Sequence, residues 1–239
     1  MSKRYGVQDV LRDVALEVPT GQVFGLIGPG ASGKSVLTKT FCGLVRPDRG
    51  GVEVDGQDIA RMSEIGLHAV RSRFGMQFQN NALFTHLTVA ENIAFPLRRL
   101  TDLSDAEIRV RVEERLERVG LAGFGDRMPG GLSGGQKKRV GVARATVNQS
   151  PYIIYDEPTA GLDPVTSQKI FDLLRDEQRA TGNTVVMISS DVGGLLTVLD
   201  RVGMMLRGKL IFHGTVPDAR SSLQPEVKQF IHGETEGPL

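Results

Sequence analysis

The chain is predicted to fold as an α/β domain with an inserted group of helices. Three stretches of its 239 residues support this prediction. An apolar run over Val23 to Ile27 precedes a glycine-rich loop and a helical run that ends near Cys42, which is the order strand, loop, helix. A second continuous apolar run, Pro151 to Tyr155, is typical of a parallel strand buried on both faces. Between them, residues 80 to 130 show mainly helical spacing.

The overall composition is that of an ordinary globular protein, with 40% hydrophobic and 24% charged residues. The formal net charge of +1 provides no broad basic surface, so we expect no nucleic-acid partner. The single cysteine, Cys42, cannot form an internal disulfide, which fits a reducing compartment, and we expect it in the core. No apolar stretch approaches the ~20 residues that span a bilayer. The chain would therefore serve a membrane only from the cytoplasmic side, through a partner.

The N-terminal part is expected to contain a half-buried antiparallel strand. In residues 10 to 18, apolar side chains such as Val14 alternate with polar or small ones, as in a strand with one face on the core. Pro19 to Gly21 would form the following turn. Tyr5 precedes this strand in a short polar stretch, where an isolated aromatic residue is by default a packing residue.

The glycine-rich loop fits the phosphate-binding pattern G-x-x-x-x-G-K-[ST]. Its glycines let backbone N–H groups turn toward a phosphate at the positive end of the next helix. Lys34 would add positive charge at the β- and γ-phosphates, and the Ser35 hydroxyl would be a ligand of Mg²⁺. The alternative is a turn that matches by chance, but the preceding strand and following helix argue against it. The predicted nucleotide-binding residues are Gly28, Pro29, Gly30, Ala31, Ser32, Gly33, Lys34, Ser35 and Val36.

Two further strands and a first inserted helix are expected after this loop. Val52 to Gly56 predicts a short strand with a turn, and Phe74 to Phe78 predicts a strand that ends at Gln79. A glutamine at the end of a strand is usually just solvated. Thr88 to Arg98 has helical spacing, although Pro96 should kink or end the helix.

A second inserted helix has a clear start signal. Ser104, with Glu107 three residues later, forms a capping box. The apolar stripe that follows, beginning with Ile108 and Val112, predicts an amphipathic helix whose charged residues face solvent.

A second candidate anion site follows the inserted helices. Leu132 and Ser133 precede two glycines and Gln136 at the start of a helical run to about Asn148. The serine hydroxyl, the free backbone N–H groups and the helix dipole converge at such a helix start. An N-capped helix with a basic surface fits this segment alone equally well.

Two carboxylates follow the second buried run. Asp156 and Glu157 would lie at the carboxyl end of the sheet, where open α/β sheets bind ligands. Asp156 could hold Mg²⁺ through water, and Glu157 could polarise the water that attacks a γ-phosphate. A strand that simply ends in charged residues is the alternative.

The C-terminal third is expected to contain both helices and strands. Asp163 as N-cap and Pro164 at the first helical position start a helix that Gly182 closes. Thr184 to Ile188 predicts a buried strand. The last expected elements are a hairpin over Val202 to Leu206 and Lys209 to Phe212, and a short helix from Pro225.

The order of these motifs resembles that of the ATP-binding-cassette (ABC) ATPases. The resemblance implies a P-loop NTPase core, which is a RecA-like mixed sheet with an antiparallel β subdomain, and an inserted α-helical subdomain that docks on a membrane subunit. It implies a single ABC domain over 1–239, with a core at about 1–79 and 150–220, a helical and signature subdomain at about 80–149, and a tail at about 221–239. The matching elements are Gly28–Ser35, Gln79, Leu132–Gln136, Ile153–Glu157 and Asp163.

The resemblance also implies a head-to-tail dimer that binds ATP and Mg²⁺. ATP on the phosphate loop of one copy would be closed by Ser133, Gly134, Gly135 and Gln136 of the other. Tyr5 matches the aromatic residue that stacks on adenine. Gln79 matches the glutamine that touches Mg²⁺ and reports to the permease, and Asp163 matches the aspartate that follows the catalytic glutamate, here Glu157. Since the chain holds one copy of each motif, it needs a partner cassette, and the complete set favours a homodimer.

Within that family, two segments resemble the cassettes of the Mla/Mce-type lipid transporters. These are Phe78 to Phe84 and Glu91 to Arg98. Met128-Pro129 and the tail from Val227 to Gly233, with Gly237-Pro238 beyond it, agree with this resemblance. It implies phospholipid transport between bacterial membranes, with integral-membrane permease subunits and an MCE-type lipid-binding subunit. The chain would be peripheral, at the cytoplasmic face of the inner membrane.

One position departs from the family pattern. After the strand that follows Glu157, the family has a histidine that contacts the γ-phosphate, and this chain has Ser190. We expect Ser190 to keep a hydrogen bond to the γ-phosphate without the reach of an imidazole, so that ATP hydrolysis persists at a reduced rate. Loss of one positioned group typically costs on the order of 10²-fold or more in rate.

Two other functions fit part of the sequence. One is a soluble ABC protein that couples ATP to nucleic acid or translation, but such proteins usually carry two cassettes or long coiled-coil inserts. The other is a nucleotide-gated assembly module in which Ser190 has nearly abolished turnover, and the intact Glu157 argues against it. The leading prediction is the ATP-hydrolysing subunit of a membrane transporter.

Overall fold

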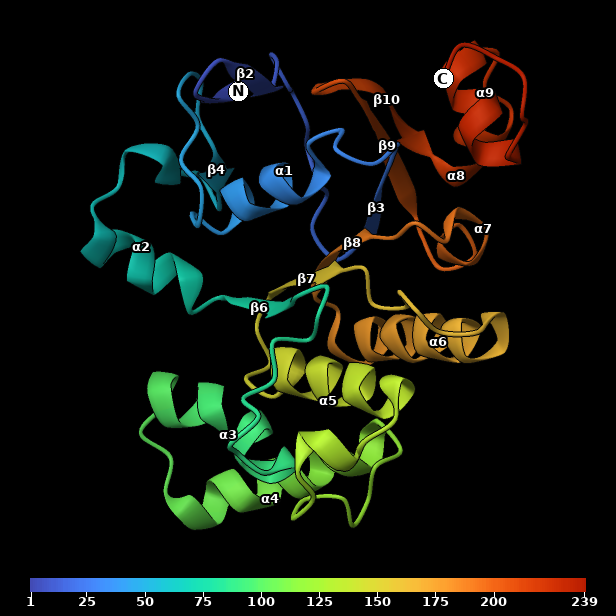
Figure 1. Ribbon diagram of the computed structural model, residues 1–239. Helices are drawn as coiled ribbons and strands as arrows, with labels where there is room; N and C mark the ends of the chain where they lie inside the picture. Colours follow the sequence, from blue (N-terminus) through green and yellow to red (C-terminus); the bar gives the residue numbers. More distant parts are fainter.

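Six strands form one sheet that separates two layers of helices (Figure 1). In this computed structural model, which describes residues 1 to 239, the strand order is β10-β9-β3-β8-β7-β6. All neighbouring strands are parallel except β10, which is antiparallel to β9. This mixed sheet confirms the predicted α/β class. The strands are β3 (Val23–Ile27), β6 (Phe74–Gln77), β7 (Tyr152–Asp156), β8 (Thr184–Ile188), β9 (Arg201–Leu206) and β10 (Lys209–Thr215).

Side chains of the central strands alternate between two cores. Ile154 of β7 packs in one cluster with Leu37 of α1 and with Cys42, which is buried as expected. Its neighbours Ile153 and Tyr155 point to the other face and join a larger cluster with α5 and α6. Figure 1 accordingly shows α1 on one side of the sheet and α5 and α6 on the other. These helices are α1 (Lys34–Phe41), α5 (Gly134–Thr146) and α6 (Pro164–Thr181).

The predicted strand over residues 10 to 18 is wrong beyond Leu11. β1 (Lys3–Tyr5) and β2 (Gln8–Leu11) form an antiparallel pair, after which the chain leaves the ladder. Asp13 has a left-handed backbone with φ of 51°, which a regular strand does not accommodate. The alternation in burial is nonetheless present, because Val14 is buried while its neighbours on both sides are exposed. The pattern therefore predicted the faces of this segment but not its hydrogen bonding.

A short hairpin and a helix lie beyond the end of α1 that is distant from the phosphate loop. They are β4 (Glu53–Val54), β5 (Gln57–Asp58), the 3₁₀ turn η1 (Ile59–Arg61) and α2 (Glu64–Arg71). Leu67 and Val70 of α2 are buried in a small separate cluster with Val52 and Ile59.

The inserted helices share the larger core of the sheet. Apolar residues of α3 and α4, such as Val89 and Leu116, belong to the same cluster as Ile153 and the buried face of α5. A buried ion pair between Arg115 of α4 and Glu177 of α6 adds a polar contact between the insertion and the sheet layer. The insertion therefore packs continuously onto the core. Its elements are α3 (Val89–Leu100), α4 (Asp105–Arg118), the 3₁₀ turn η2 (Pro129–Gly131) and α5.

Pro96 does not end α3, which continues for a further turn to Leu100. Proline removes one backbone hydrogen bond in a helix. Here Val89, Ile93 and Leu97 on both sides of Pro96 are buried, so the tertiary packing of the helix outweighs this local cost. The capping box of Ser104 and Glu107 at the start of α4 is confirmed.

The predicted C-terminal strand, hairpin and last helix are present, and the short helices α7 and α8 are additional to the prediction. Three short helices come after β8 and β10, and the last residue, Leu239, donates its N–H to Gln229 Oε1 at 2.9 Å. No helix of the protein is both long and apolar enough to cross a membrane. The short helices are α7 (Val192–Leu195), α8 (Val216–Arg220) and α9 (Pro225–His232).

Candidate functional site

The loop between β3 and α1 leaves its backbone donors free. The N–H groups of Gly30, Ala31, Lys34 and Ser35 have no acceptor in the protein, and Gly33, the N-cap of α1, has no side-chain cap. Free N–H groups at a helix N-terminus form an anion site, because they add to the positive end of the helix dipole.

Two glycines of this loop are required by close contacts. Gly28 has φ of 136°, and a Cβ there would lie 2.0 Å from the carbonyl oxygen of Met205. Gly33 has φ of 102°, and its Cβ would lie 2.7 Å from the carbonyl oxygen of Val10. The strand β9 and the hairpin β1–β2 thus pack against the loop, and a side chain at either glycine would displace the loop.

Lys34 extends back over the loop that precedes it. Its Nζ donates to the carbonyl oxygens of Gly28 at 2.7 Å and Pro29 at 2.8 Å. Burial lowers the pKa of Lys34, and the negative charges of Glu157 and Asp156 partly offset this effect. The structure therefore brings Lys34 close to both predicted carboxylates.

Asp156 is a buried carboxylate at the end of β7. Burial raises its pKa, the neighbouring charge of Glu157 raises it further, and a hydrogen bond from the Ser35 hydroxyl opposes the shift. A charge held in this way is stabilised by a nearby cation. Hydroxyl and carboxylate oxygens such as those of Ser35 and Asp156 are hard ligands that suit Mg²⁺, so the residues present fit this ion.

Glu157 has a strained backbone and a fixed side chain. Its φ is 52°, in the left-handed region that non-glycine residues rarely occupy. Its Oε2 accepts hydrogen bonds from both the N–H and the hydroxyl of Ser190, each at 3.0 Å. The expectation for Ser190 is therefore revised: its hydroxyl is directed to Glu157 in this structure.

Gln79 is exposed just after β6, and the structure connects it to Glu157 through a residue that sequence reasoning missed. Lys138 Nζ donates to the carbonyl oxygens of Gln79 at 2.7 Å and Glu157 at 3.0 Å. In the sequence Lys138 belongs to a basic run that suggests a solvated surface. The available signal was its helical spacing from the apolar Val142 and Ala145, which places it on the buried side of α5.

The second glycine-rich helix start lies on the other side of the sheet from α1 (Figure 1). Ser133 and Gln136 form a complete capping box, with each side chain accepting the backbone N–H of the other residue. A Cβ on Gly135 would lie 3.2 Å from Cγ2 of Thr166, so this helix start adjoins the start of α6. Asp163 caps α6 by accepting the N–H of Thr166 at 3.0 Å. Ser133–Gln136 and Asp163 thus form a second group, distinct from the phosphate loop.

A family model described as "ABC transporter" matches residues 11–160, which include the phosphate loop, the second helix start and both carboxylates. The chain belongs to the ABC transporter family. It is therefore an ATP-binding cassette, the ATP-hydrolysing subunit of a transporter.

Curated relatives of this cassette are named as ATP-binding proteins of different transport systems. It is 39% identical over 239 residues to the probable ribonucleotide transport ATP-binding protein Mkl of Mycobacterium leprae, covering 100% of this chain and 69% of Mkl. It is 42% identical over 241 residues to the methionine import ATP-binding protein MetN of Caulobacter vibrioides, covering 100% and 72%. It is 36% identical over 234 residues to the intermembrane phospholipid transport system ATP-binding protein MlaF of Escherichia coli K12, covering 98% and 87%.

A solved structure shows a similar cassette as a dimer. This ATP-binding cassette, in a post-hydrolysis state bound to ADP and Pi, superposes with a TM-score of 0.83 and 30% identity, covering 90% of this chain and 95% of that one. The likeness confirms the cassette fold. It also shows that a cassette of this kind forms dimers.

Tyr5 of the cassette lies on β1 with half of its surface exposed. The ammonium of Lys3 lies 5.3 Å from its ring centroid. Because β2, the partner of β1, supports the phosphate loop through the carbonyl of Val10, Tyr5 belongs to the hairpin beside that loop.

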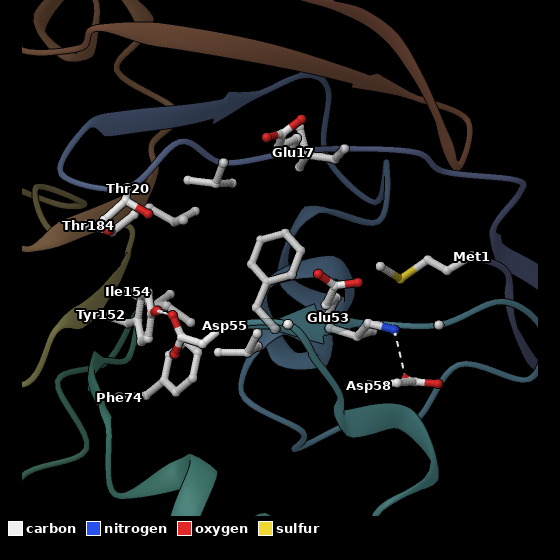
Figure 2. Close-up of a pocket in the computed structure, with 18 of the residues that line it drawn as sticks. Met1, Glu17, Thr20, Glu53, Asp55, Asp58, Phe74, Tyr152, Ile154 and Thr184 are labelled. Atoms are coloured by element: carbon white, nitrogen blue, oxygen red, sulfur yellow. Dashed lines mark hydrogen bonds between the residues drawn. The ribbon is translucent and has the colours of Figure 1, made fainter.

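One sizeable cavity of the cassette lies away from the phosphate loop. It has a volume of about 770 Å³ and lies between the end of α1, the hairpin β4–β5 and the starts of β7 and β8. Figure 2 shows its acidic rim, including Glu17 and Glu53, and its aromatic wall at Phe74 and Tyr152. None of the predicted site residues lines it. The phosphate loop lies elsewhere, and its tip at Gly30 and Ala31 is exposed.

Proposed function

We propose that this cassette drives a phospholipid transporter of the Mla/Mce type. Two copies would assemble head to tail with integral-membrane permease subunits and an MCE-type lipid-binding subunit, at the cytoplasmic face of the inner membrane. The relatives named above are named for three different cargoes, so their names do not select one. The proposal therefore depends on the surface of the cassette that contacts the permease.

The residues around β7 supply the chemistry of ATP hydrolysis in this proposal. Within the segment from Gly28 to Val36, the free N–H groups of Gly30, Ala31, Lys34 and Ser35 and the charge of Lys34 bind the phosphates. Ser35, Gln79 and Asp156 would hold Mg²⁺, which neutralises phosphate charge when bound. Glu157 orients and polarises the attacking water, and Ser190 holds the Glu157 carboxylate in place.

The division of the site residues into two groups supports the head-to-tail dimer. Ser133–Gln136 and Asp163 lie at the N-termini of α5 and α6, and these helices lie on the opposite side of the sheet from α1 (Figure 1). This placement favours a role at the phosphate loop of another copy. A second copy with reversed orientation would bring its Ser133–Gln136 segment over that loop, and Tyr5 would stack on the adenine. The solved dimeric relative is consistent with this arrangement.

One apolar groove supports the assignment of the cargo. It has a volume of about 330 Å³ and opens at the free edge strand β6, between the sheet and the inserted helices. Both segments that resemble the Mla/Mce-type cassettes contribute to it. Phe95 lies 4.7 Å from Phe84 between ring centroids, and Phe78 and Leu100 are more than one-third exposed. The groove is lined by residues that include Phe78, Ala82, Phe84, Phe95, Pro96 and Leu100.

Affinity purification from native membranes in mild detergent tests this proposal. Mass spectrometry should find a permease, an MCE-type subunit and bound phospholipid with the tagged cassette. Leu100→Glu places a charge in the groove and should abolish recovery of the permease while ATP hydrolysis by the isolated cassette persists. Leu223→Glu, at a side chain that is 94% exposed outside the groove, is the matched control and should recover the whole assembly. Recovery of an amino-acid or nucleotide transporter, or of soluble partners alone, would overturn the lipid assignment.

A nucleotide-gated module with very slow turnover is the second candidate, because Ser190 replaces the family histidine. Phosphate release by the purified cassette with and without Glu157→Gln separates the two. A transport ATPase should lose most of its activity on this substitution, whereas a binding module should show the same negligible rate in both forms.

A further inference from the structure

The helix α5 holds the loop after β6 by a row of polar contacts. Lys138 donates to the carbonyl of Gln79, and Arg144, two turns further on, donates to the carbonyls of Asn81 at 2.5 Å and Ala82 at 2.7 Å. Between them Gly141 leaves room for Gln77, since a Cβ on Gly141 would lie 3.3 Å from its Cγ. The loop that carries Gln79 is therefore fastened to α5 along its length.

Lys138 differs from Arg144 because it also reaches the catalytic strand. The residue is 5% exposed, and its ammonium donates to two backbone carbonyl oxygens, those of Glu157 and Gln79, rather than to a carboxylate. Burying an ammonium without an ion pair is costly unless hydrogen bonds compensate. Both of its carbonyl partners therefore matter to its position.

The contact with Glu157 occurs at a strained residue. The left-handed backbone of Glu157 orients its carbonyl toward α5, where Lys138 donates to it, while Ser190 holds the carboxylate at the other end. A backbone in this region persists only when its surroundings hold it. Removal of the Lys138 ammonium would release one of these restraints.

We propose that Lys138 is a positioning residue for ATP hydrolysis, which connects the groove-lining loop at residues 78–82 to the backbone of Glu157. Occupation of the groove then alters the placement of Glu157 through one side chain. The proposal deepens the proposed function and rests on it, because it takes Glu157 as the residue that polarises water.

Lys138→Met tests the connection, since methionine keeps most of the length and the apolar stem but removes the donors. We expect kcat for ATP hydrolysis to fall by between about 10- and 100-fold, as for small misplacements of a reacting group, while KM changes by less than about two-fold. Lys138→Arg, which retains several donors, should recover part of kcat. Lys137→Met, at the adjacent lysine, should behave as wild type.

Amide hydrogen exchange supplies a readout that does not depend on activity. In Lys138→Met, exchange should accelerate together in peptides covering 78–82 and 157–160, and not in those covering α1. If Lys138→Met does not fold, Lys138→Gln is the second variant, and its melting temperature and exchange are measured in the same way. Unchanged exchange in both peptides, an equal loss of kcat in Lys137→Met, or a rise in KM at constant kcat would overturn the proposal.

Glu157→Gln distinguishes failure of this proposal from failure of the proposed function. If Glu157→Gln hydrolyses ATP at the wild-type rate, the role given to Glu157 is wrong and the Lys138 proposal falls with it. If Glu157→Gln is inactive while Lys138→Met is as fast as wild type, only the Lys138 proposal is overturned.

Discussion

The cassette contains two glycine-rich helix starts, and they differ in how their polar groups are used. At the start of α1, the N–H groups of Gly30, Ala31, Lys34 and Ser35 are all free. At the start of α5, the side chains and backbone N–H groups of Ser133 and Gln136 bond to each other in the capping box. Only the N–H groups of the two glycines between them are free. Similar sequence signals thus produce one open anion site and one that is nearly satisfied by its own chain.

This difference suits the two helix starts to different roles in nucleotide binding. The first has the groups that bind a phosphate without help from another chain, because its free N–H groups and the Lys34 ammonium belong to one loop. The second keeps its geometry without a ligand, so it can present a rigid surface to a nucleotide that is bound elsewhere. Substitutions at the two starts should therefore affect nucleotide binding and hydrolysis differently.

The largest effect is expected at the first start. Lys34→Ala removes the positive charge over the phosphate loop, so both ATP affinity and hydrolysis should fall, with hydrolysis reduced on the order of 10³-fold. Nucleotide titration of the isolated chain and phosphate release measure the two quantities. An unchanged affinity would mean that the first start does not bind phosphate by itself.

A smaller and more selective effect is expected at the second start. Ser133→Ala should leave the affinity of the isolated chain for ATP unchanged, while hydrolysis falls by roughly 10²-fold, because in the proposed dimer this residue closes the partner's site. Loss of the N-cap should also lower the stability of α5 by about 1 kcal/mol, which thermal unfolding can measure. Equal losses of affinity at both starts would remove the distinction between them.

Substitutions of Ser190 test whether this residue positions Glu157, the carboxylate proposed to polarise the attacking water. Ser190→Ala removes one of two hydrogen bonds to Glu157 and should slow single-turnover hydrolysis by about 10-fold, since a hydrogen bond to a charged group is worth about 1.5–3 kcal/mol and the backbone N–H bond remains. Ser190→His should change the single-turnover rate as well. If both variants hydrolyse ATP at the wild-type rate, residue 190 does not position Glu157.

The smallest expected effect concerns stability. The raised pKa of Asp156, due mainly to burial, means that the folded state binds this proton more tightly than the unfolded chain. The contribution of Asp156 to the free energy of unfolding should therefore decrease as the pH rises from its unfolded pKa to its folded pKa. At neutral pH, Asp156→Asn should raise the melting temperature by about 2–4 °C while hydrolysis is lost.

Asp163, beside the second helix start, should show a pH dependence of stability opposite in sign to that of Asp156. Hydrogen bonds from Thr166 lower its pKa, so its contribution to stability is present above its unfolded pKa and is lost as the pH falls through its folded pKa. Asp163→Asn should therefore produce no rise in melting temperature at neutral pH. Melting temperatures of both variants and the wild type are compared between pH 3 and pH 7. The differences separate the contributions of Asp156 and Asp163 from those of the other carboxylates. A rise for Asp163→Asn would contradict the assignment.

Much of the fold was predictable because its signals are local. The strands at Thr184–Ile188 and Tyr152–Asp156 are continuous apolar runs, and Asp163, Pro164 and Gly182 bound α6 as predicted. The predicted strand over residues 10 to 18 was wrong beyond Leu11 because contacts with residues far away in the sequence determine its hydrogen bonding. Arg12 donates its N–H to the carbonyl of Gly208 rather than to a neighbouring strand.

The candidate site was predictable in its residue types but not in all of its contacts. A phosphate loop requires glycines and a lysine at fixed spacing, because backbone geometry and reach are set within a few residues. Lys138 is different, since its two partners, Gln79 and Glu157, lie far away in the chain in opposite directions. No local pattern records such a contact.

The sequence by itself determined the main strands and helices, though not α2, α7 and α8, and it determined the glycine-rich form of the phosphate loop and the capping of α5 and α6. These features depend on residues within one or two turns of each other. The tertiary structure alone decided that Ser133–Gln136 lies across the sheet from α1, that Ser190 holds Glu157, and that Lys138 joins Gln79 to Glu157. The physical reason is that these contacts depend on the packing of the two cores against the sheet, where the alternation of side chains sends neighbouring residues to opposite faces.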